Sequence, residues 1–278
     1  MNARNNIATE MPEEFVRFSF NQRAQHLVMM VSFTLLVLTG LPQKFASEGW
    51  AQALILAIGG IETVRLVHRG CALVFAAEGI YHLGYIGWLV STGRFTTSMI
   101  PGMRDVTDAL NAFRYCVGTG KAMPRFDRYD YRQKFEYWGV MLGWLIMVST
   151  GLVMMFPAQA TQVLPGAFIP TAREMHGGEA LLVLLVIVTW HLYGAHLNPL
   201  RFPGDTSIFT GKISRQRMLE EHPLEYARLL RIRERMEVPA PTPAEEFLVG
   251  DLPEAEPAGR GDMDSALAEL MGTPRDKR

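Results

Sequence analysis

The chain has 278 residues, 49% of them hydrophobic, and a formal net charge of −1. It therefore lacks the excess of positive charge that would indicate a nucleic acid partner. Its two cysteines, Cys71 and Cys116, provide neither a disulfide framework nor a CxxC metal motif. The first residues are polar and do not have the pattern of a secretory signal, so we expect the first apolar block to stay in the mature protein.

Apolar residues concentrate in four blocks, each near the length of about 20 residues that a membrane-spanning helix needs. Proline follows the ends of three of them, at Pro42, Pro157 and Pro199, as at an ordinary helix stop. A shorter apolar stretch, 50–61, predicts an interfacial or re-entrant piece. We expect an all-α integral membrane protein, a four-helix bundle over 21–197, with spans at about 21–41, 64–90, 135–156 and 172–197.

Basic residues predict the orientation, because short cytoplasmic loops are enriched in Lys and Arg. The segment 91–134 holds eight of them, 42–62 holds one and 157–171 holds none. We therefore expect a multi-pass protein of the bacterial inner membrane with both termini in the cytoplasm. The terminal parts are an N-terminal segment 1–20, an extension 198–237 with a helical pattern from His222 to Met236, and a mostly disordered tail 238–278 rich in Pro, Glu and Ala.

Six of the seven histidines fall in or at the edges of the spans, where ionisable residues are costly and indicate function. His68 and His82 are 14 residues apart, and His176 and His191 are 15 apart, so each pair lies roughly on one helix face about 21 to 22 Å apart along the axis. The helix directions place histidines at two depths: His68 and His176 at the outer level, and His26, His82 and His191 at the inner level.

Two levels of histidine in a four-helix bundle are typical of two stacked haems, because neutral imidazole is a good axial ligand to haem iron. A single histidine in a membrane helix is ordinarily a packing or interface residue. Six histidines with paired spacings at two depths favour a functional role over packing. A metal-ion transporter would want ligands clustered at one depth with carboxylates nearby. A haem-free membrane anchor or such a transporter is the alternative function. We find no internal repeat, Gly-rich phosphate loop, nucleophile elbow or HExxH motif, and no catalytic residue is assigned.

A set of short pieces between Arg17 and Pro223 resembles the cytochrome b (gamma) subunit of respiratory formate dehydrogenase and its relatives in nickel-iron hydrogenase and thiosulfate reductase. The pieces are RAQH at 23–26, RLVH at 65–68, YDYRQKFEYW at 129–138, MHGG at 175–178, WHLY at 190–193 and GKISRQRMLEEHP at 211–223. The set in this order is more specific than any piece alone.

The resemblance implies two haem b groups and their ligands: His68 and His176 for the outer haem, and His26 and His191 for the inner one. It also implies a quinone site, for menaquinone or ubiquinone, beside the inner haem at the segment that contains Asp130 and Gln133. His82 remains an alternative inner ligand, since other cytochromes b take all four ligands from two helices at a spacing near 14.

Three features depart from the family pattern. In the family, the two ligands on the fourth helix are separated by one residue fewer than His176 and His191 are here. Asp130 stands where a member of the family has Asn. His82 and His196 are additional, although we do not expect them to hold a third haem because their depths match only approximately. Glu78, four residues before His82 on the same helix face, is a candidate partner for that histidine in proton transfer.

The function expected from these features is a dihaem cytochrome b that carries electrons between a periplasmic redox partner and the quinone pool. It would be the electron-transfer and quinone-reactive subunit of an oxidoreductase complex, and whether it is itself an enzyme is left open by the sequence. The partners expected are a periplasmic iron-sulfur or multihaem cytochrome c subunit, quinone and membrane lipid, with no nucleic acid. A homo-oligomer of the complex is compatible with the sequence.

Overall fold

The computed structural model describes residues 11–199 and 201–237. The expected disorder of the tail 238–278 and the structure of residues 1–10 lie outside this range. The chain divides into two compact units. The membrane unit comprises 16–123 and 129–213, and the described residues of the terminal unit are 11–15, 124–128 and 214–237.

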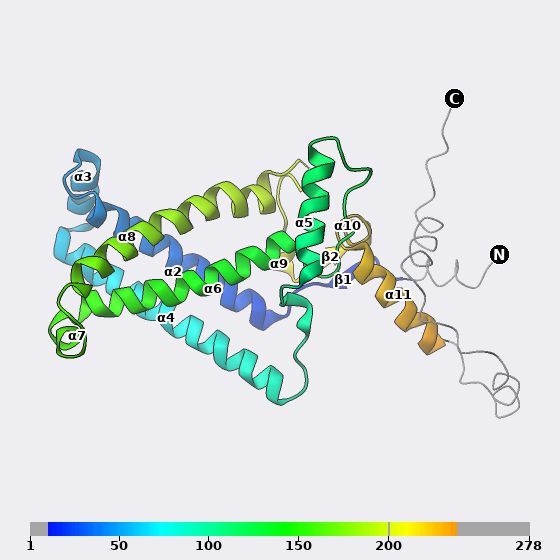
Figure 1. Cartoon of the computed structure of the whole chain (residues 1–278), viewed down its shortest axis with the longest axis horizontal. Helices are drawn as coiled ribbons and strands as arrows, with labels where there is room; N and C mark the ends of the chain where they lie inside the picture. Colours follow the sequence, from blue (N-terminus) through cyan, green and yellow to red (C-terminus); the bar gives the residue numbers. More distant parts are fainter. Residues whose placement is uncertain (1–10, 200, 238–278) are drawn as a thin grey trace, which may run out of the picture. The chain divides into compact units, whose positions relative to one another are not determined.

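Four long helices form the membrane unit, and each is long and apolar enough to cross a bilayer (Figure 1). They are α2 (Phe20–Lys44), α4 (Ile61–Ser91), α6 (Tyr131–Met155) and the continuous helix Phe168–Leu197, which consists of α8 (Phe168–Val186) and the π-helical segments η2 (Ile187–His191) and η3 (Tyr193–Leu197). The expected all-α membrane bundle is therefore confirmed.

The first span does not stop at Pro42 as expected, because this proline lies inside the last turn of α2. A proline there removes one hydrogen bond of the final turn, and α2 continues until Phe45 closes it by donating its N–H to the Leu41 carbonyl. At its other end, Ser19 and Gln22 exchange hydrogen bonds between side chain and backbone, a capping box that starts the helix.

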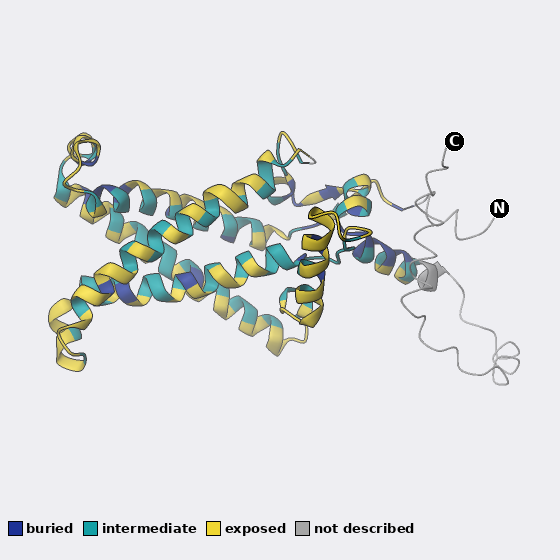
Figure 2. Ribbon diagram, turned by 45° about the horizontal axis from the view of Figure 1, so that its top comes forward, coloured by how far each residue is buried: buried dark blue, intermediate teal, exposed yellow. Residues whose placement is uncertain are grey.

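Many large apolar residues of the spans are exposed. Buried residues are sparse along the spans (Figure 2). Leu66, Leu73 and Leu142 are each more than half exposed. Contiguous apolar surface on this scale indicates contact with something other than water. For helices of this length and composition, that surface is the one that faces lipid.

The spans associate as two helix pairs, since α2 packs chiefly on α4, and α6 packs chiefly on α8. Direct contacts between the two pairs are much fewer. Short helices cap the turns at one end of the pairs: α3 (Gly49–Ile58), which ends at the left-handed Gly59, and α7 (Pro157–Val163), which begins at a proline. The apolar stretch 50–61 is thus mostly a short helix that does not span.

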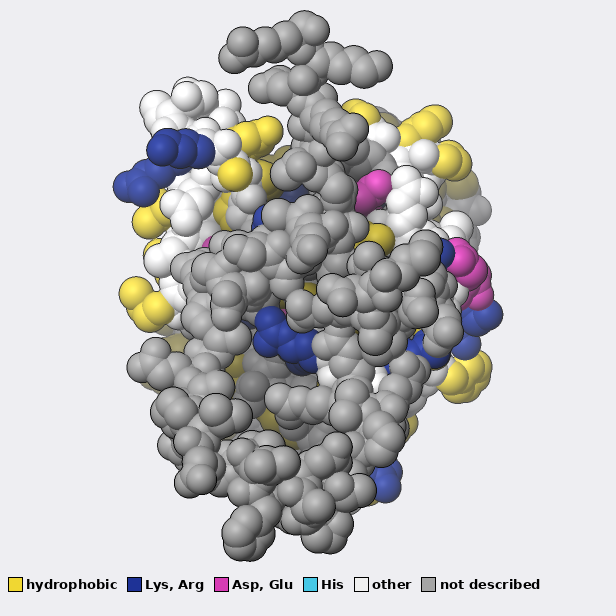
Figure 3. Space-filling model, turned by 90° about the vertical axis from the view of Figure 1, so that its right-hand side faces the viewer, with side chains coloured by type: hydrophobic (Ala, Val, Ile, Leu, Met, Phe, Trp, Pro, Cys, Tyr) yellow, Lys and Arg dark blue, Asp and Glu magenta, His cyan; other side chains and the backbone are white. Residues whose placement is uncertain are grey.

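The basic segment between α4 and α6 contains secondary structure that the sequence analysis treated as loop. It forms the short 3₁₀ turn η1 (Thr97–Met99) and a helix, α5 (Met103–Cys116). Arg94, Arg114 and Lys121 of this segment are exposed. Lys and Arg side chains are visible at several places on the face of the molecule that Figure 3 displays.

The last described elements are α9 (Ser207–Thr210), β2 (Lys212–Ser214), α10 (Arg215–Glu221) and α11 (Pro223–Glu237), and β2 pairs with β1 (Glu14–Val16) in a two-stranded sheet. In the terminal unit, Arg128 donates to the buried carboxylate of Glu225 at 2.6 Å, and the ring of Tyr226 packs edge-on against Phe15. The helical pattern expected from His222 to Met236 corresponds to α11, with His222 as the residue that ends α10.

Candidate functional site

The start of α6 is fixed by the two residues expected to border a quinone. A carboxylate oxygen of Asp130 accepts from the Gln133 backbone N–H at 2.8 Å, and the Gln133 side chain accepts from the Asp130 N–H at 3.1 Å. Arg132 pairs with the other carboxylate oxygen at 2.6 Å. The carboxylate of Asp130 is buried. It caps the helix with one oxygen and binds the Arg132 guanidinium with the other.

His68 on α4 and His176 on α8 face each other across the two helix pairs. Their ring centroids are 6.4 Å apart, and the ring planes are inclined by 70°. Because the helices that carry them belong to different pairs, this histidine couple bridges a boundary that has few direct helix contacts.

Two buried threonines fix the protonation of these rings. The Thr39 hydroxyl lies 2.6 Å from the Leu35 carbonyl and 2.9 Å from Nδ1 of His68, and Thr150 repeats this arrangement with the Ile146 carbonyl and His176. A hydroxyl has one proton, and it goes to the carbonyl, so the threonine oxygen must accept from Nδ1–H. Each neutral imidazole is then left with an unprotonated Nε2.

A glycine follows each threonine and makes room for the same ring. A Cβ on Gly40 would lie 3.1 Å from Cε1 of His68, and a Cβ on Gly151 would lie 3.4 Å from Cε1 of His176. The sequence Thr-Gly-Leu thus occurs twice, at 39–41 and 150–152, and serves equivalent histidines. The sequence analysis found no internal repeat, and this three-residue repeat was the signal it missed.

His26 on α2 and His191 on η2 form a second couple, with ring centroids 6.2 Å apart and planes inclined by 34°. Nδ1 of His191 lies 3.1 Å from a carboxylate oxygen of Glu136 on α6. The first couple has neutral hydroxyl partners, whereas this couple has a carboxylate partner. Glu136 was not singled out from the sequence, although it falls within the piece 129–138.

The π-helical turn η2 explains how His191 can lie 15 residues after His176. Fifteen residues at about 100° each end about 60° past the starting face of an α-helix. A π turn closes with i→i+5 hydrogen bonds, so it accommodates one more residue per turn and winds less per residue. The one residue by which the separation of His176 and His191 exceeds 14 is accommodated in 187–191, next to the histidine itself.

His82 has other partners. Its Nδ1 lies 2.7 Å from the Gln25 side-chain oxygen and its Nε2 lies 2.8 Å from the Tyr137 hydroxyl, so both ring nitrogens are engaged. Neither contact is with Glu78, the partner suggested by the helical spacing. The ring of His196 lies against Gly204.

The two histidine couples fit a metal between their rings. A metal–imidazole bond is about 2.0 Å long and the ring centre lies about 1 Å beyond the nitrogen, so two imidazoles on opposite sides of one metal have centroids about 6 Å apart. The couples match this at 6.4 and 6.2 Å. In the His68–His176 couple, the two unprotonated Nε2 atoms cannot hydrogen-bond to each other. Each has a lone pair that can coordinate a metal. Among the described residues, no group of three or more His, Cys, Asp or Glu side chains could hold a metal ion.

The comparisons with known proteins identify the family of the chain. The chain is 23% identical over 211 residues, which are 76% of this chain and 89% of the relative, to the cytochrome b556(Fdn) subunit of nitrate-inducible formate dehydrogenase from Escherichia coli K12. The corresponding subunits of E. coli O157:H7 and Shigella flexneri match equally. Residues 17–211 match the family described as prokaryotic cytochrome b561, most of the chain and all four spans. The chain therefore belongs to the prokaryotic cytochrome b561 family and is a multi-pass membrane b-type cytochrome of electron transfer.

Proposed function

We propose that the chain carries two haem b groups, one ligated by His68 and His176 and the other by His26 and His191, and that it transfers electrons between a redox partner and quinone. The observation that carries this proposal is the pair of facing imidazole couples at centroid distances of 6.4 and 6.2 Å. A bound haem supplies an iron that accepts and releases single electrons.

The protein residues set what each site does. Thr39 and Thr150 hold the imidazoles of the first couple in the tautomer that leaves Nε2 available for a metal. Glu136 holds His191 with a carboxylate, which makes that imidazole a stronger electron donor. His26 is favoured over His82 as the partner of His191, because both nitrogens of His82 are engaged by Gln25 and Tyr137.

Quinone reduction needs protons as well as electrons, and the residues for this lie near the second couple. Gln25 and His26 are consecutive on α2, and Glu136 and Tyr137 are consecutive on α6, so the contacts of His82 adjoin those of His191. We place the quinone headgroup, menaquinone or ubiquinone, at this level. Asp130 and Gln133 shape the helix start beside it. His82 exchanges protons through its contact with the Tyr137 hydroxyl, and the Gln25 side chain orients the imidazole.

The partner and the orientation complete the proposal. The relative is named as a subunit of a formate dehydrogenase, so we propose a periplasmic iron-sulfur subunit, or a multihaem cytochrome c, beside the His68–His176 level. We also propose that the protein lies in the bacterial inner membrane with both termini in the cytoplasm, and the eight basic residues of the segment 91–134 support this orientation. The parts 1–20, 198–237 and 238–278 are then cytoplasmic.

The test is haem quantification in the purified full chain by its pyridine haemochrome spectrum, together with single histidine replacements. We expect two haems per chain, and one after His68→Ala or His191→Ala. Absence of haem from the intact protein would instead favour the haem-free anchor or metal-ion transporter. One haem that survives every replacement would contradict the ligand assignment.

A further inference from the structure

The helix α5 carries an apolar face that is exposed in the structure. Met103, Val106, Leu110, Phe113 and Val117 are each more than half exposed. At about 100° per residue, their directions fall within an arc of about 80° on one side of the helix and its C-terminal cap. Such a stripe on the surface of a connecting segment requires a covering partner.

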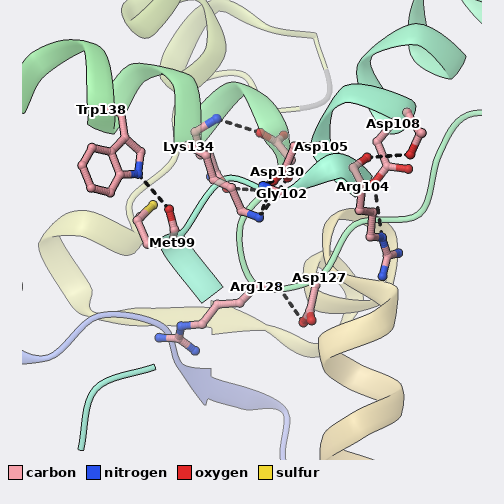
Figure 4. A network of polar contacts seen from close by, with 12 residues as sticks. Met99, Gly102, Arg104, Asp105, Asp108, Asp127, Arg128, Asp130, Lys134 and Trp138 are labelled. Atoms are coloured by element: carbon pink, nitrogen blue, oxygen red, sulfur yellow. Dashed lines mark hydrogen bonds and ion pairs between the residues drawn. The ribbon is translucent and has the colours of Figure 1, made fainter. Parts of the chain in front are cut away.

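The opposite side of α5 is the one that packs on protein. Asp108 and Ala112 are buried on that side. Lys134 of α6 pairs with the Asp105 carboxylate at 2.9 Å, which ties the first turn of α5 to the first turn of α6 (Figure 4). The exposed stripe therefore points away from the bundle contacts of this helix.

The position of α5 matches the surface of a bilayer. The helix runs across the direction of the spanning helices at the end where α6 begins (Figure 1). The indole N–H of Trp138 donates to the Met99 carbonyl at 3.1 Å, and Trp138 lies seven residues, or about 10 Å, into α6. The chain just before α5 thus reaches the depth of an aromatic residue of the kind enriched at membrane interfaces.

We infer that α5 lies in the membrane–water interface, with the stripe 103, 106, 110, 113 and 117 buried among lipid acyl chains. Exposed Arg114 at the edge of the stripe, and Lys121 after the helix, carry charges that complement anionic headgroups. Ile100, just before α5, and Phe135, in the second turn of α6, are also exposed apolar residues. The occupant of the stripe is lipid.

The test uses spin labels on the full chain in nanodiscs that contain phosphatidylglycerol, with Cys71 and Cys116 replaced by serine. One label is placed at Phe113→Cys, in the stripe, and the matched control at Asn111→Cys, an exposed position of the same helix outside it. We expect the label at 113 to be relaxed more by oxygen than by a water-soluble nickel complex, and the label at 111 to show the reverse. The circular dichroism of both variants reports that the helices are intact.

Two results would overturn the inference. A label at 113 that is as accessible to the nickel complex as the label at 111 would place the stripe in water. A label at 113 that is shielded from both relaxing agents would place protein over the stripe, either another subunit or a second copy of the chain.

Discussion

Glu136 and Tyr137 are consecutive on α6, yet they contact two different histidines: the Glu136 carboxylate lies 3.1 Å from Nδ1 of His191, and the Tyr137 hydroxyl lies 2.8 Å from Nε2 of His82. Residues one apart on a helix point about 100° apart, so α6 contacts both neighbouring helices at one depth. A group proposed for electron transfer and a group proposed for proton transfer are therefore held by the same turn.

Replacing Glu136 by Gln should raise the midpoint potential of one haem. The amide can still accept from His191 but has no negative charge, and a charged acceptor is stronger by about 1 kcal/mol, which corresponds to about 40 mV for one electron. Redox titration followed in the visible spectrum measures both haems, so the unchanged one is the internal control. Equal shifts in both haems, or none, would contradict the asymmetry of the two sites.

Replacing Thr39 or Thr150 by Val should weaken haem retention at the His68–His176 site, by about 10- to 100-fold in affinity, because Nδ1–H loses its acceptor. Haem loss to apomyoglobin measures this. Thr34→Val is the matched control, because the Thr34 hydroxyl makes the same bond to a carbonyl one turn back, at Met30, and is exposed. Equal haem loss from Thr34→Val and Thr39→Val would show that the hydroxyl does not act through the histidine.

Replacements at His26 and His82 should have different effects on haem content. His26→Ala should lower the content from two haems to one, since His191 loses the ring that faces it. His82→Gln should keep both haems and slow quinone reduction, because it removes the imidazole that exchanges protons through the Tyr137 hydroxyl. Retention of two haems by His26→Ala with loss of one by His82→Gln would assign the ligand to His82 instead.

Changing the length of η2 by one residue should show whether the π turn sets the position of His191. Deletion of Val188 restores a spacing of 14 residues and allows a regular α-helix, so both haems should remain bound. Insertion of one alanine after Val188 rotates His191 by about 100° and should remove one haem. Haem stoichiometry of the two variants checks this, and two haems in the insertion variant would show that the π turn does not set the position of His191.

The stability of the terminal unit should fall in alkaline solution. Burial raises the pKa of Tyr226 above its ordinary value of 10.0, with a smaller opposing effect of Arg215. The unfolded tyrosine therefore ionises first, and the stability it contributes is lost as pH rises above about 10. Subtilisin cleavage after α10 should accelerate in this range and do so less in Tyr226→Phe; identical pH profiles of the two proteins would exclude this tyrosine as the cause.

The four spans were predictable because the length of an apolar stretch alone distinguishes a membrane helix. Helical periodicity predicted which histidines lie on the same face of a helix. The sequence analysis did not find α5, since its average polarity resembles a loop, although the stripe 103, 106, 110, 113 and 117 is visible at helical spacing. Glu78 was the candidate partner of His82, and Tyr137 was not considered, because only contacts within one helix can be read from spacing. Contacts between helices depend on rotation and depth, which the sequence does not fix.

The threonines illustrate the same limit. A threonine in a membrane helix ordinarily satisfies its hydroxyl with a carbonyl one turn back, and Thr34, Thr39 and Thr150 all do so. Thr39 and Thr150 also contact a histidine of a neighbouring helix, whereas Thr34 has no such contact among the described residues. Comparison of 39–41 with 150–152 would have raised the question, since both stretches have the sequence Thr-Gly-Leu.

The association of the spans as two helix pairs, bridged by histidines, has a consequence for biogenesis. Each pair is a helical hairpin with extensive contacts inside it, whereas direct contacts between the hairpins are few. Under the proposed function, haem held by the histidine couples would add to the joint between the hairpins. A ligand that binds only the assembled form stabilises it by mass action. Under the proposed function, cells starved of haem would therefore accumulate separated hairpins open to membrane proteases, and the supply of cofactor would set the amount of this subunit.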